Sequence, residues 1–505
     1  MRSRRILAPS IVLTIVALLA ALAPPTFAAD LNESKGFRKA VTLAGIREHQ
    51  AALQEVADDN AGTRSSGTPG YRASADYVAE RLEAAGYDAT LQPFPFAFYR
   101  QLAPSTFERV SPQPITYTEG SAADYTPMTY SGSGNVTATV STVGGLGCTA
   151  ADFAGFPAGN IALISRGTCT FATKAGNAQA VGATAVVIYN NIGGPLNGTL
   201  GAPNFTIPVL GTTQAIGVTN AALVPGGLTF HVATSTDSET RTTWNVIAET
   251  ASGDPNRVVV VGAHLDSVLP GPGINDNGSG SGAILEIAEV FAAQNRTARN
   301  KLRFMWYGAE EFNLLGSQFY VNSLSQAERD KVMAMVNFDM VGSPNYVRFV
   351  YDGDNSAFPV GPGAAEGPPG SAYLETLFVD YFNAVGLAND PTPFSGRSDY
   401  GPFIAVGIPA GGLFTGAEGI KTAAQATTYG GTAGIAYDPC YHQACDTFAN
   451  NSNTGLDQMS DAAAHVILTL SRVKVDVRET EAVAALRTSG SRVADAPGPE
   501  ELPDR

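Results

Sequence analysis

Charged residues are scarce in this chain of 505 residues: only 15% are Asp, Glu, Lys or Arg, whereas 44% are hydrophobic. A disordered chain shows the opposite balance, so the composition predicts a globular protein. Basic residues number 31 against 46 acidic ones, which leaves a formal net charge of -15. Because nucleic-acid binding depends on Lys and Arg, this deficit argues against a nucleic-acid partner. At this length two folded units are expected.

Long apolar runs are absent beyond the N-terminus. There, residues 11–23 form an apolar run that follows three arginines and precedes the small residues Ala28 and Ala29. This is the pattern of a secretory signal peptide, here residues 1–29, and the run is shorter than the roughly 20 residues that span a bilayer. We therefore expect a secreted, extracellular protein with no membrane contact after the signal is removed.

Cysteine and histidine are also rare, with four and five residues. Export to an oxidising compartment predicts that the cysteines are paired, and four cysteines allow three pairings. Two histidines, His264 and His442, lie in candidate site loops. His49, His231 and His465 lack such surroundings, and His465 is expected on a helix surface or in the core.

Two separate parts of the chain have clear helix and strand patterns. Residues 41–98 hold two helical stretches and one strand, and after residue 244 buried strands alternate with helices. Continuous apolar runs at 258–262 and 302–307 are typical of strands buried on both faces, and a helical pattern at 281–293 lies between them. This alternation predicts an α/β sheet with parallel strands. Between the two parts the sequence is rich in Gly, Thr, Val and Pro, with one helical stretch at 173–181. The predicted units are residues 37–102 with 241–473, an inserted β-rich domain at 103–240, and a disordered tail at 474–505.

Six side chains form the candidate site. Most of these residues directly follow a predicted strand or lie at the start of a helix, which is where ligands bind in α/β sheets. The six are His264, Asp276, Glu310, Glu311, Asp339 and His442.

Imidazole nitrogen and carboxylate oxygen are zinc ligands. Two metals that share one carboxylate would use two His and three carboxylates, which leaves one Glu as a general base. Taken singly, the residues have simpler readings: His264 as a loop residue, Asp276 as a helix cap, and the Glu pair as solvated. Only the ordered set points to metal chemistry.

The segments that carry these residues resemble those of the secreted bacterial leucyl aminopeptidases and the aminopeptidase Y group of dizinc metallopeptidases. The resemblance covers residues 41–98 and 244–472, and it is carried by the segments 262–267, 275–280, 308–311, 337–340, 396–399 and 440–442. It implies the zinc exopeptidase fold, a phosphorylase/hydrolase-like mixed sheet sandwiched by helices.

The resemblance also implies a role for each matching residue. One Zn²⁺ would take His264 and Asp339, a second Glu311 and His442, with Asp276 as the bridge. The remaining implied roles are general acid/base for Glu310, oxyanion stabilisation for Tyr441, orientation of His264 for Asp266, substrate contact for Arg397, and an apolar side-chain pocket for Met340 and Phe414. Relatives carry a calcium site at positions matching Asp457 and Asp461, but their N-terminal aspartate has no counterpart at 39–42, so Ca²⁺ is not supported.

The insert resembles a protease-associated domain, through residues 160–171 and 182–191. Relatives of that domain often link positions that match Cys148 and Cys169, which leaves Cys440 with Cys445. Both pairings are expectations from the domain assignment.

Together these features predict a secreted zinc aminopeptidase that removes the N-terminal residue of peptides with a free N-terminus. Large apolar residues, Leu foremost, are the expected substrates, because Met340 and Phe414 would line the pocket. A carboxypeptidase of the same fold is one alternative, and two others remain open at this point. One is a glutaminyl cyclase-like enzyme, and the other is a non-catalytic binding ectodomain, which would have lost metal ligands that this chain retains.

Overall fold

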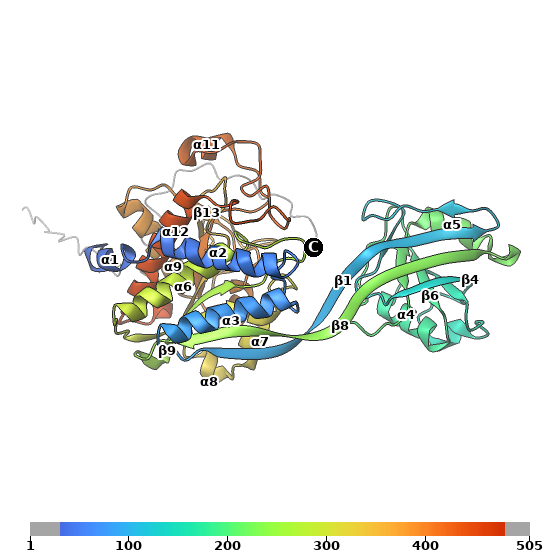
Figure 1. Cartoon of the computed structure of the whole chain (residues 1–505), viewed down its shortest axis with the longest axis horizontal. Coiled ribbons are helices and arrows are strands. Elements are labelled where there is room, and N and C mark those ends of the chain that lie inside the picture. The colour runs from blue at the N-terminus through green and yellow to red at the C-terminus, as the bar shows by residue number, and fades with distance from the viewer. Residues whose placement is uncertain (1–30, 480–505) are drawn as a thin grey trace, which may run out of the picture.

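The computed structural model describes residues 31–479, so the expected signal peptide and residues 480–505 lie outside the described part. The described chain forms two lobes joined by two long antiparallel strands, β1 (Thr90–Ser111) and β8 (Thr229–Glu249) (Figure 1). We call the segments before β1 and after β8 the larger lobe, and the segment between these strands the smaller lobe. Each strand contributes one end to each lobe.

The larger lobe is built on a mixed sheet. Its strands, in spatial order, are β13 (Asp390–Thr392), β12 (Phe349–Tyr351), β14 (Ala410–Phe414), β11 (Val332–Phe338), β9 (Asp254–His264), β10 (Asn300–Tyr307) and β8, with β1 beside β8. The central strands β14, β11, β9 and β10 are parallel, whereas β12 and β8 pair with them antiparallel. The predicted mixed α/β sheet is therefore confirmed.

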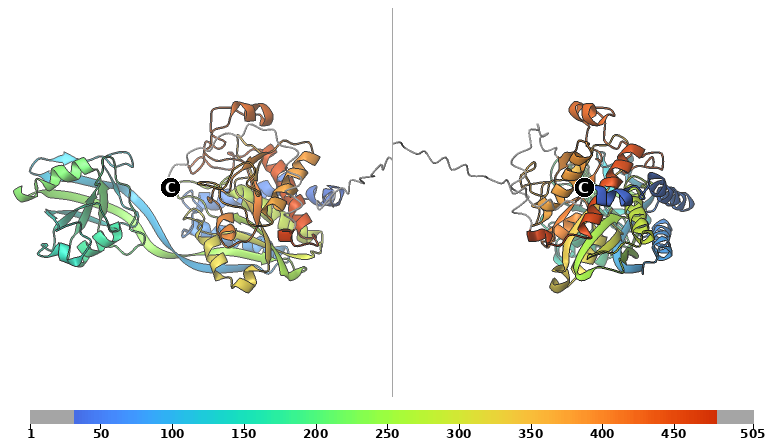
Figure 2. Two further views of the ribbon diagram at one scale, coloured as in Figure 1. Left: turned by 180° about the vertical axis from the view of Figure 1, so that it is seen from behind. Right: turned by 90° about the vertical axis from the view of Figure 1, so that its left-hand side faces the viewer.

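Helices cover both faces of this sheet (Figure 2), because its central strands carry buried apolar residues on both faces. Val259 and Val261 pack into the core on one face of the sheet, while Val258 and Val260 pack into the core on the other face. Each buried valine contributes about 1.5–3 kcal/mol through the area it removes from water. The helices of this lobe are α1 (Leu31–Arg38), α2 (Leu43–Asp59), α3 (Pro69–Ala84), α6 (Gly278–Ala293), α7 (Leu315–Ser323), α8 (Gln326–Arg329), α9 (Ser371–Ala384), α10 (Tyr400–Ala405), α11 (Ala423–Tyr429), α12 (Asn453–Leu470) and the 3-10 helix η3 (Val477–Glu479).

The smaller lobe has a second, partly parallel sheet. Its elements are β2 (Ile115–Thr116), β3 (Tyr125–Pro127), β4 (Gly134–Thr142), β5 (Ile161–Ser165), β6 (Ala185–Tyr189), β7 (Val209–Thr212), the helices α4 (Phe171–Ala180) and α5 (Gln214–Ala221), and the 3-10 helices η1 (Ala150–Phe153) and η2 (Val224–Gly226). The single helix expected here is α4, so α5 corrects that expectation. Gly217 and Thr219 are poor helix formers, which hid α5 in the sequence, but Thr213 caps it by accepting from Ile216 N at 3.3 Å.

Both predicted edges of the insert fall inside continuous strands. Ala97 pairs with Thr240 and Ala103 with Ser235, and β1 and β8 continue beyond these pairs into the smaller lobe. The change in composition near residue 103 therefore marks where the strands change neighbours, and the boundaries at 102 and 240 stay predictions. The predicted tail starts at 474, yet Val477 is fully buried against the larger lobe. Within residues 31–479, no helix combines the length and apolarity needed to cross a membrane.

Candidate active site

Three neighbouring strands bring the candidate residues to one edge of the larger lobe's sheet. His264 is the last residue of β9 and pairs with Tyr307, the last residue of β10. Glu310 follows β10, and Asp339 directly follows β11, which lies on the other side of β9. Because these strands are parallel, their carboxyl ends meet, as expected for a ligand site in this class of sheet.

The six side chains form two groups that share Asp276. In the first group, His264 Nε2 lies 3.1 Å from Asp276 Oδ1 and 3.2 Å from Asp339 Oδ1. In the second, His442 Nε2 lies 3.1 Å from Glu311 Oε2 and 3.3 Å from Asp276 Oδ2. Each Asp276 oxygen thus faces a different histidine. Glu310 Oε2 is 4.0 Å from His264 Nε2, so it belongs to the site but stands farther from this nitrogen.

These side chains are buried except that of His442, which is half-buried, and their charges are poorly balanced. Burial, together with Glu311, raises the pKa of Glu310 well above its usual range. Burial would also raise the pKa of Asp276, but hydrogen bonds with His264 and His442 lower it instead. Within residues 31–479, no Lys or Arg forms an ion pair with these carboxylates, so among the described residues the positive charge must come from histidines or a bound cation.

The donor set fits two zinc ions. A tetrahedral site with bonds of about 2.0–2.1 Å separates its ligand atoms by about 3.3–3.4 Å, close to the four distances above. Glu311 Oε1 is buried without a hydrogen-bond partner, as expected of an oxygen that awaits a cation. His264 Nδ1 lies 3.1 Å from the carbonyl of Asp266; since a carbonyl only accepts, Nδ1 carries the proton and Nε2 is directed at the carboxylates.

Asp266 has a different contact from the one expected. Its backbone carbonyl, rather than its carboxylate, makes the nearer contact with His264, and the carboxylate Oδ1 lies 3.7 Å from Nδ1. The same Oδ1 accepts from the backbone N of Glu310 at 3.1 Å. Asp266 therefore links the β9 loop to the β10 loop.

Several residues that the sequence did not single out hold the ligand loops in place. Arg64 is fully buried and donates to the carbonyls of Leu265, Pro272 and Gly273, so its guanidinium organises the loop after β9. Asp446 accepts from the backbone N of Asp276 at 2.9 Å. These partners come from distant parts of the chain, and no local pattern identifies them.

Two further supports lie within motifs that the sequence did highlight. The Asn277 side chain caps α6 by accepting from Gly280 N at 2.9 Å, and it donates to Phe338 O at 2.9 Å, which ties α6 to the end of β11. Ser398 Oγ donates to Asp339 Oδ2 at 2.6 Å. Gly280 permits this close packing, because a Cβ there would lie 2.1 Å from Phe338 O.

The predicted substrate residues border the two groups. Tyr441 stacks on the His442 ring, and its oxygen accepts from Arg397 Nη2 at 3.0 Å. Arg397 is held in turn by Glu418, whose Oε1 lies 2.5 Å from Nη1. Met340 and Phe414 lie at neighbouring strand ends, since Thr415 N donates to Met340 O at 2.8 Å.

Three of the site's backbone positions have a left-handed conformation that non-glycine residues rarely adopt. Ala309, Met340 and His442 have φ values of 51°, 51° and 57°. Such strained residues cluster where a structure must aim side chains at a ligand. Here they flank or belong to the ligand-bearing turns.

The structure contains the disulfides Cys148–Cys169 and Cys440–Cys445, the same pairs that the domain assignment implies. Asp461 of the implied calcium position lies 3.5 Å from the guanidinium of Arg38. His465 is buried in the core, and His231 pairs with Glu108 on the smaller lobe. The expectation that His49 lacks carboxylate neighbours is wrong, because Glu286 and Glu289 of α6 approach it.

Comparisons with known proteins place the two lobes in two families. Residues 245–467 match the model of peptidase family M28, and residues 134–219 match that of the PA domain. An aminopeptidase of Pseudomonas aeruginosa is 45% identical over 474 residues, covering 90% of this chain and 86% of the relative. A probable leucine aminopeptidase 2 of Aspergillus fumigatus is 44% identical over 399 residues, 78% of this chain and 76% of the relative.

Solved structures agree with these sequence relatives. The aminopeptidase from Aneurinibacillus sp. strain AM-1 is 29% identical, with a TM-score of 0.60 over 88% of this chain and 97% of its own. A zinc aminopeptidase from Bacillus subtilis is 26% identical, with a TM-score of 0.54 over 84% of this chain and 94% of its own.

Proposed function

Because the chain belongs to peptidase family M28, we propose that it is an aminopeptidase that uses two zinc ions to remove the N-terminal residue of peptides. The observation that carries the proposal is the pair of histidine–carboxylate groups that share Asp276. One ion would be held by His264 and Asp339, the other by Glu311 and His442, with Asp276 between them. When bound, the ions would polarise the scissile carbonyl and lower the pKa of the attacking water.

The chain's own residues supply the remaining chemistry. Glu310, buried beside the ligand groups, takes the proton of the attacking water and passes it to the leaving amine. The Tyr441 oxygen accepts from Arg397, so its own proton is free to donate to the oxyanion. Met340 and Phe414 provide an apolar surface for the side chain of the N-terminal residue. The substrate's free α-amine lies near the buried carboxylates, which favours cleavage at the chain end.

The cellular location is part of the same proposal. The basic and apolar start of the sequence, followed by small residues, supports export, and the two disulfides fit an oxidising compartment. We propose that the protein is secreted. Calcium is not part of the proposal, since the Arg38 guanidinium already stands beside Asp461.

The test is an assay of purified protein against a panel of aminoacyl chromogenic amides, with and without a chelator. We expect Leu to be cleaved best and smaller apolar residues less well, since one methylene in an apolar pocket discriminates by about 1–3 kcal/mol. Chelation should abolish activity and zinc should restore it. Full activity in a metal-free sample would refute the zinc assignment, and a clear preference for Asp or Lys would refute the pocket. Conversion of N-terminal Gln into pyroglutamate that stays on the peptide, with release of ammonia, would instead favour the glutaminyl cyclase-like alternative.

A further inference from the structure

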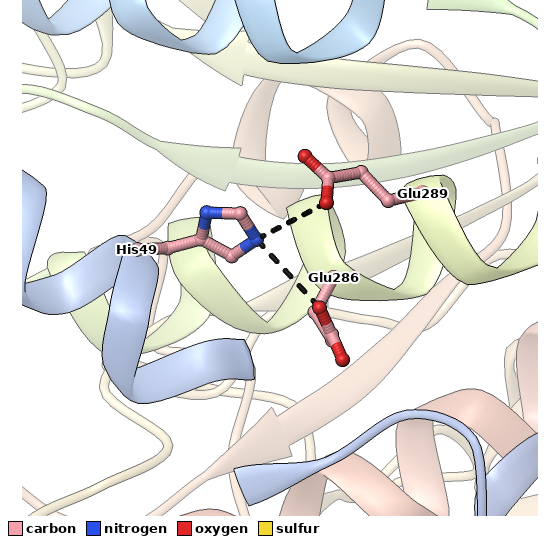
Figure 3. A group of neighbouring side chains, drawn as sticks. All are labelled: His49, Glu286 and Glu289. Atoms are coloured by element: carbon pink, nitrogen blue, oxygen red, sulfur yellow. Dashed lines mark ion pairs between the residues drawn. The ribbon is translucent and has the colours of Figure 1, made fainter. Parts of the chain in front are cut away.

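A second group of histidine and carboxylates lies between α2 and α6, away from the candidate active site. His49 of α2 points at α6, with one ring nitrogen between the carboxylates of Glu286 and Glu289 (Figure 3). His49 Nε2 lies 3.8 Å from Glu286 Oε2 and 3.8 Å from Glu289 Oε2. These distances exceed hydrogen-bonding range, so the ring nitrogen makes no hydrogen bond to either carboxylate.

His49 Nε2 has no hydrogen-bond partner, although the residue is only 1% exposed. Its other nitrogen, Nδ1, is 2.8 Å from the hydroxyl of Tyr77. A buried polar atom without a partner is uncommon in folded proteins and calls for a ligand or ion. With Nδ1 paired to Tyr77, Nε2 is the ring nitrogen left to bind an ion.

The Glu286 carboxylate is held in a fixed position facing His49. Its Oε1 accepts from the backbone N and the hydroxyl of Thr42, at 3.1 and 3.3 Å, which leaves Oε2 directed at the ring. Gly45 makes room for it, because a Cβ at that position would lie 2.3 Å from the carboxylate. This position of the Glu286 carboxylate therefore requires glycine at position 45, in the first turn of α2.

The charged side chains around His49 carry a net negative charge. Arg81 pairs with Glu289 and Glu48, at 2.7 and 2.8 Å, and supplies one positive charge to a group of three carboxylates. Arg81 thus leaves two of the three carboxylate charges without a partner of opposite sign, and one divalent cation would neutralise them. The Glu286 and Glu289 side chains are 11% and 18% exposed, so an ion has access from solvent.

We propose that His49, Glu286 and Glu289 form a third metal site, which binds a divalent cation of the zinc type and ties α2 to α6. One nitrogen and two carboxylate oxygens are a zinc-type ligand set, and water would complete the coordination. Tetrahedral geometry calls for about 3.3–3.4 Å between ligand atoms, so the 3.8 Å distances need contract only slightly. Since α6 begins just after Asp276, such a tie would also steady the helix that follows the candidate bridging ligand.

Counting bound metal tests this proposal independently of activity. The stripped full-length protein is dialysed against zinc, and bound zinc is measured by inductively coupled plasma mass spectrometry. We expect wild type to hold one equivalent more than His49→Gln and one more than Glu286→Gln, whatever the active site holds. Glu48→Gln is the matched control, because Glu48 contacts Arg81 but not His49 Nε2; it should bind as much zinc as wild type. Equal zinc in wild type and both ligand variants would overturn the site.

A second measurement needs no substitution of a buried residue. Crystals of the wild-type protein grown with zinc are examined by anomalous diffraction at the zinc edge. We expect a peak between His49 Nε2 and the two carboxylates. Peaks at His264 and His442 with none beside His49 would refute the third site and leave the proposed function intact, whereas the reverse pattern would refute the dizinc centre alone.

Discussion

The two lobes share a building plan but differ in what lies at their strand ends. In both, parallel strands are buried between two apolar layers. In the larger lobe the strand ends lead to His264, Glu310 and Asp339, whereas β5 and β6 of the smaller lobe are followed by Arg166 and Asn190. Within residues 31–479, every cluster of side chains able to hold a metal lies in the larger lobe. A parallel sheet provides a place for a site, and the residues placed there decide whether chemistry follows.

Buried charge shows the same contrast. The smaller lobe buries a cation, Lys174, which donates to Leu146 O. The larger lobe instead gathers acidic groups whose pKa values are raised by burial, among them Asp399 to about 7 and Asp446 to about 8. Accumulated buried carboxylate is unfavourable unless a cation or hydrogen bonds offset it. The larger lobe therefore gives up stability to concentrate charge at its active edge.

The largest expected effect distinguishes the roles of two adjacent glutamates of the larger lobe, Glu310 and Glu311. Glu310→Gln should leave both metals bound but lower kcat by about 100- to 10,000-fold, since proton transfer is lost. Glu311→Gln should instead lose one equivalent of zinc, because Glu311 lies 3.1 Å from His442. Steady-state kinetics and metal analysis check both. Glu119→Gln on the smaller lobe is the control and should change neither; equal zinc and equal activity in both active-site variants would contradict the division of roles.

The two disulfides, one in each lobe, test the same difference between the lobes, and the effects expected from removing them are intermediate in size. In the chain-entropy model, closing the loop between Cys148 and Cys169 contributes about 3 kcal/mol, and closing the shorter one between Cys440 and Cys445 about 2 kcal/mol. Replacing the first pair by Ser should therefore lower the melting temperature of the smaller lobe and leave kcat nearly unchanged. Replacing the second pair should lower zinc affinity or activity more than the melting temperature, because its loop carries Tyr441 and His442.

Calorimetry and amide hydrolysis, run on both double variants, separate these outcomes. Peptide mapping of the unreduced wild type provides the direct control of the pairing. A link between Cys440 and either cysteine of the smaller lobe would overturn the pairing. A strong loss of kcat from the Cys148 and Cys169 variant would show that the smaller lobe contributes to catalysis.

Much of the larger lobe could be predicted because its features are local. Apolar runs identified the central strands, and the ligand motifs follow those strands directly in sequence. The supports were not predictable, since Arg64 and Asp446 act through backbone groups of segments far away in the chain. His49 was misjudged for the same reason: its carboxylate neighbours lie on α6, some 240 residues later.

The two strands that join the lobes are longer than predicted, because local composition does not reveal which strands pair with each other. Residues beyond 98 lose clear alternation, yet β1 continues to Ser111 because β8 pairs with it along nearly its whole length. Likewise α5 forms on sequence that lacks helix propensity, packed beside β6 and capped by Thr213. Tertiary contacts outweighed local preference in both cases.

The last expected effect is confined to acid conditions, and it compares a buried histidine of the larger lobe with a partly exposed one of the smaller lobe. His465 is buried beside Tyr381, and burial lowers its pKa to about 4. In the unfolded chain the value is about 6.5, so the unfolded state binds the proton first as pH falls. The stability contributed by neutral His465 is therefore complete above pH 6.5 and is lost between pH 6.5 and 4, by at most about 1.4 kcal/mol per pH unit.

Thermal unfolding of His465→Gln should show a shallower loss across that window than wild type. His231→Gln of the smaller lobe is measured beside it, because the His231 side chain is 26% exposed and ion-paired with Glu108 instead of being buried in a core. An unchanged slope in His465→Gln would mean that its proton affinity is the same in both states, and an effect of His231→Gln alone would place the acid-sensitive histidine in the smaller lobe.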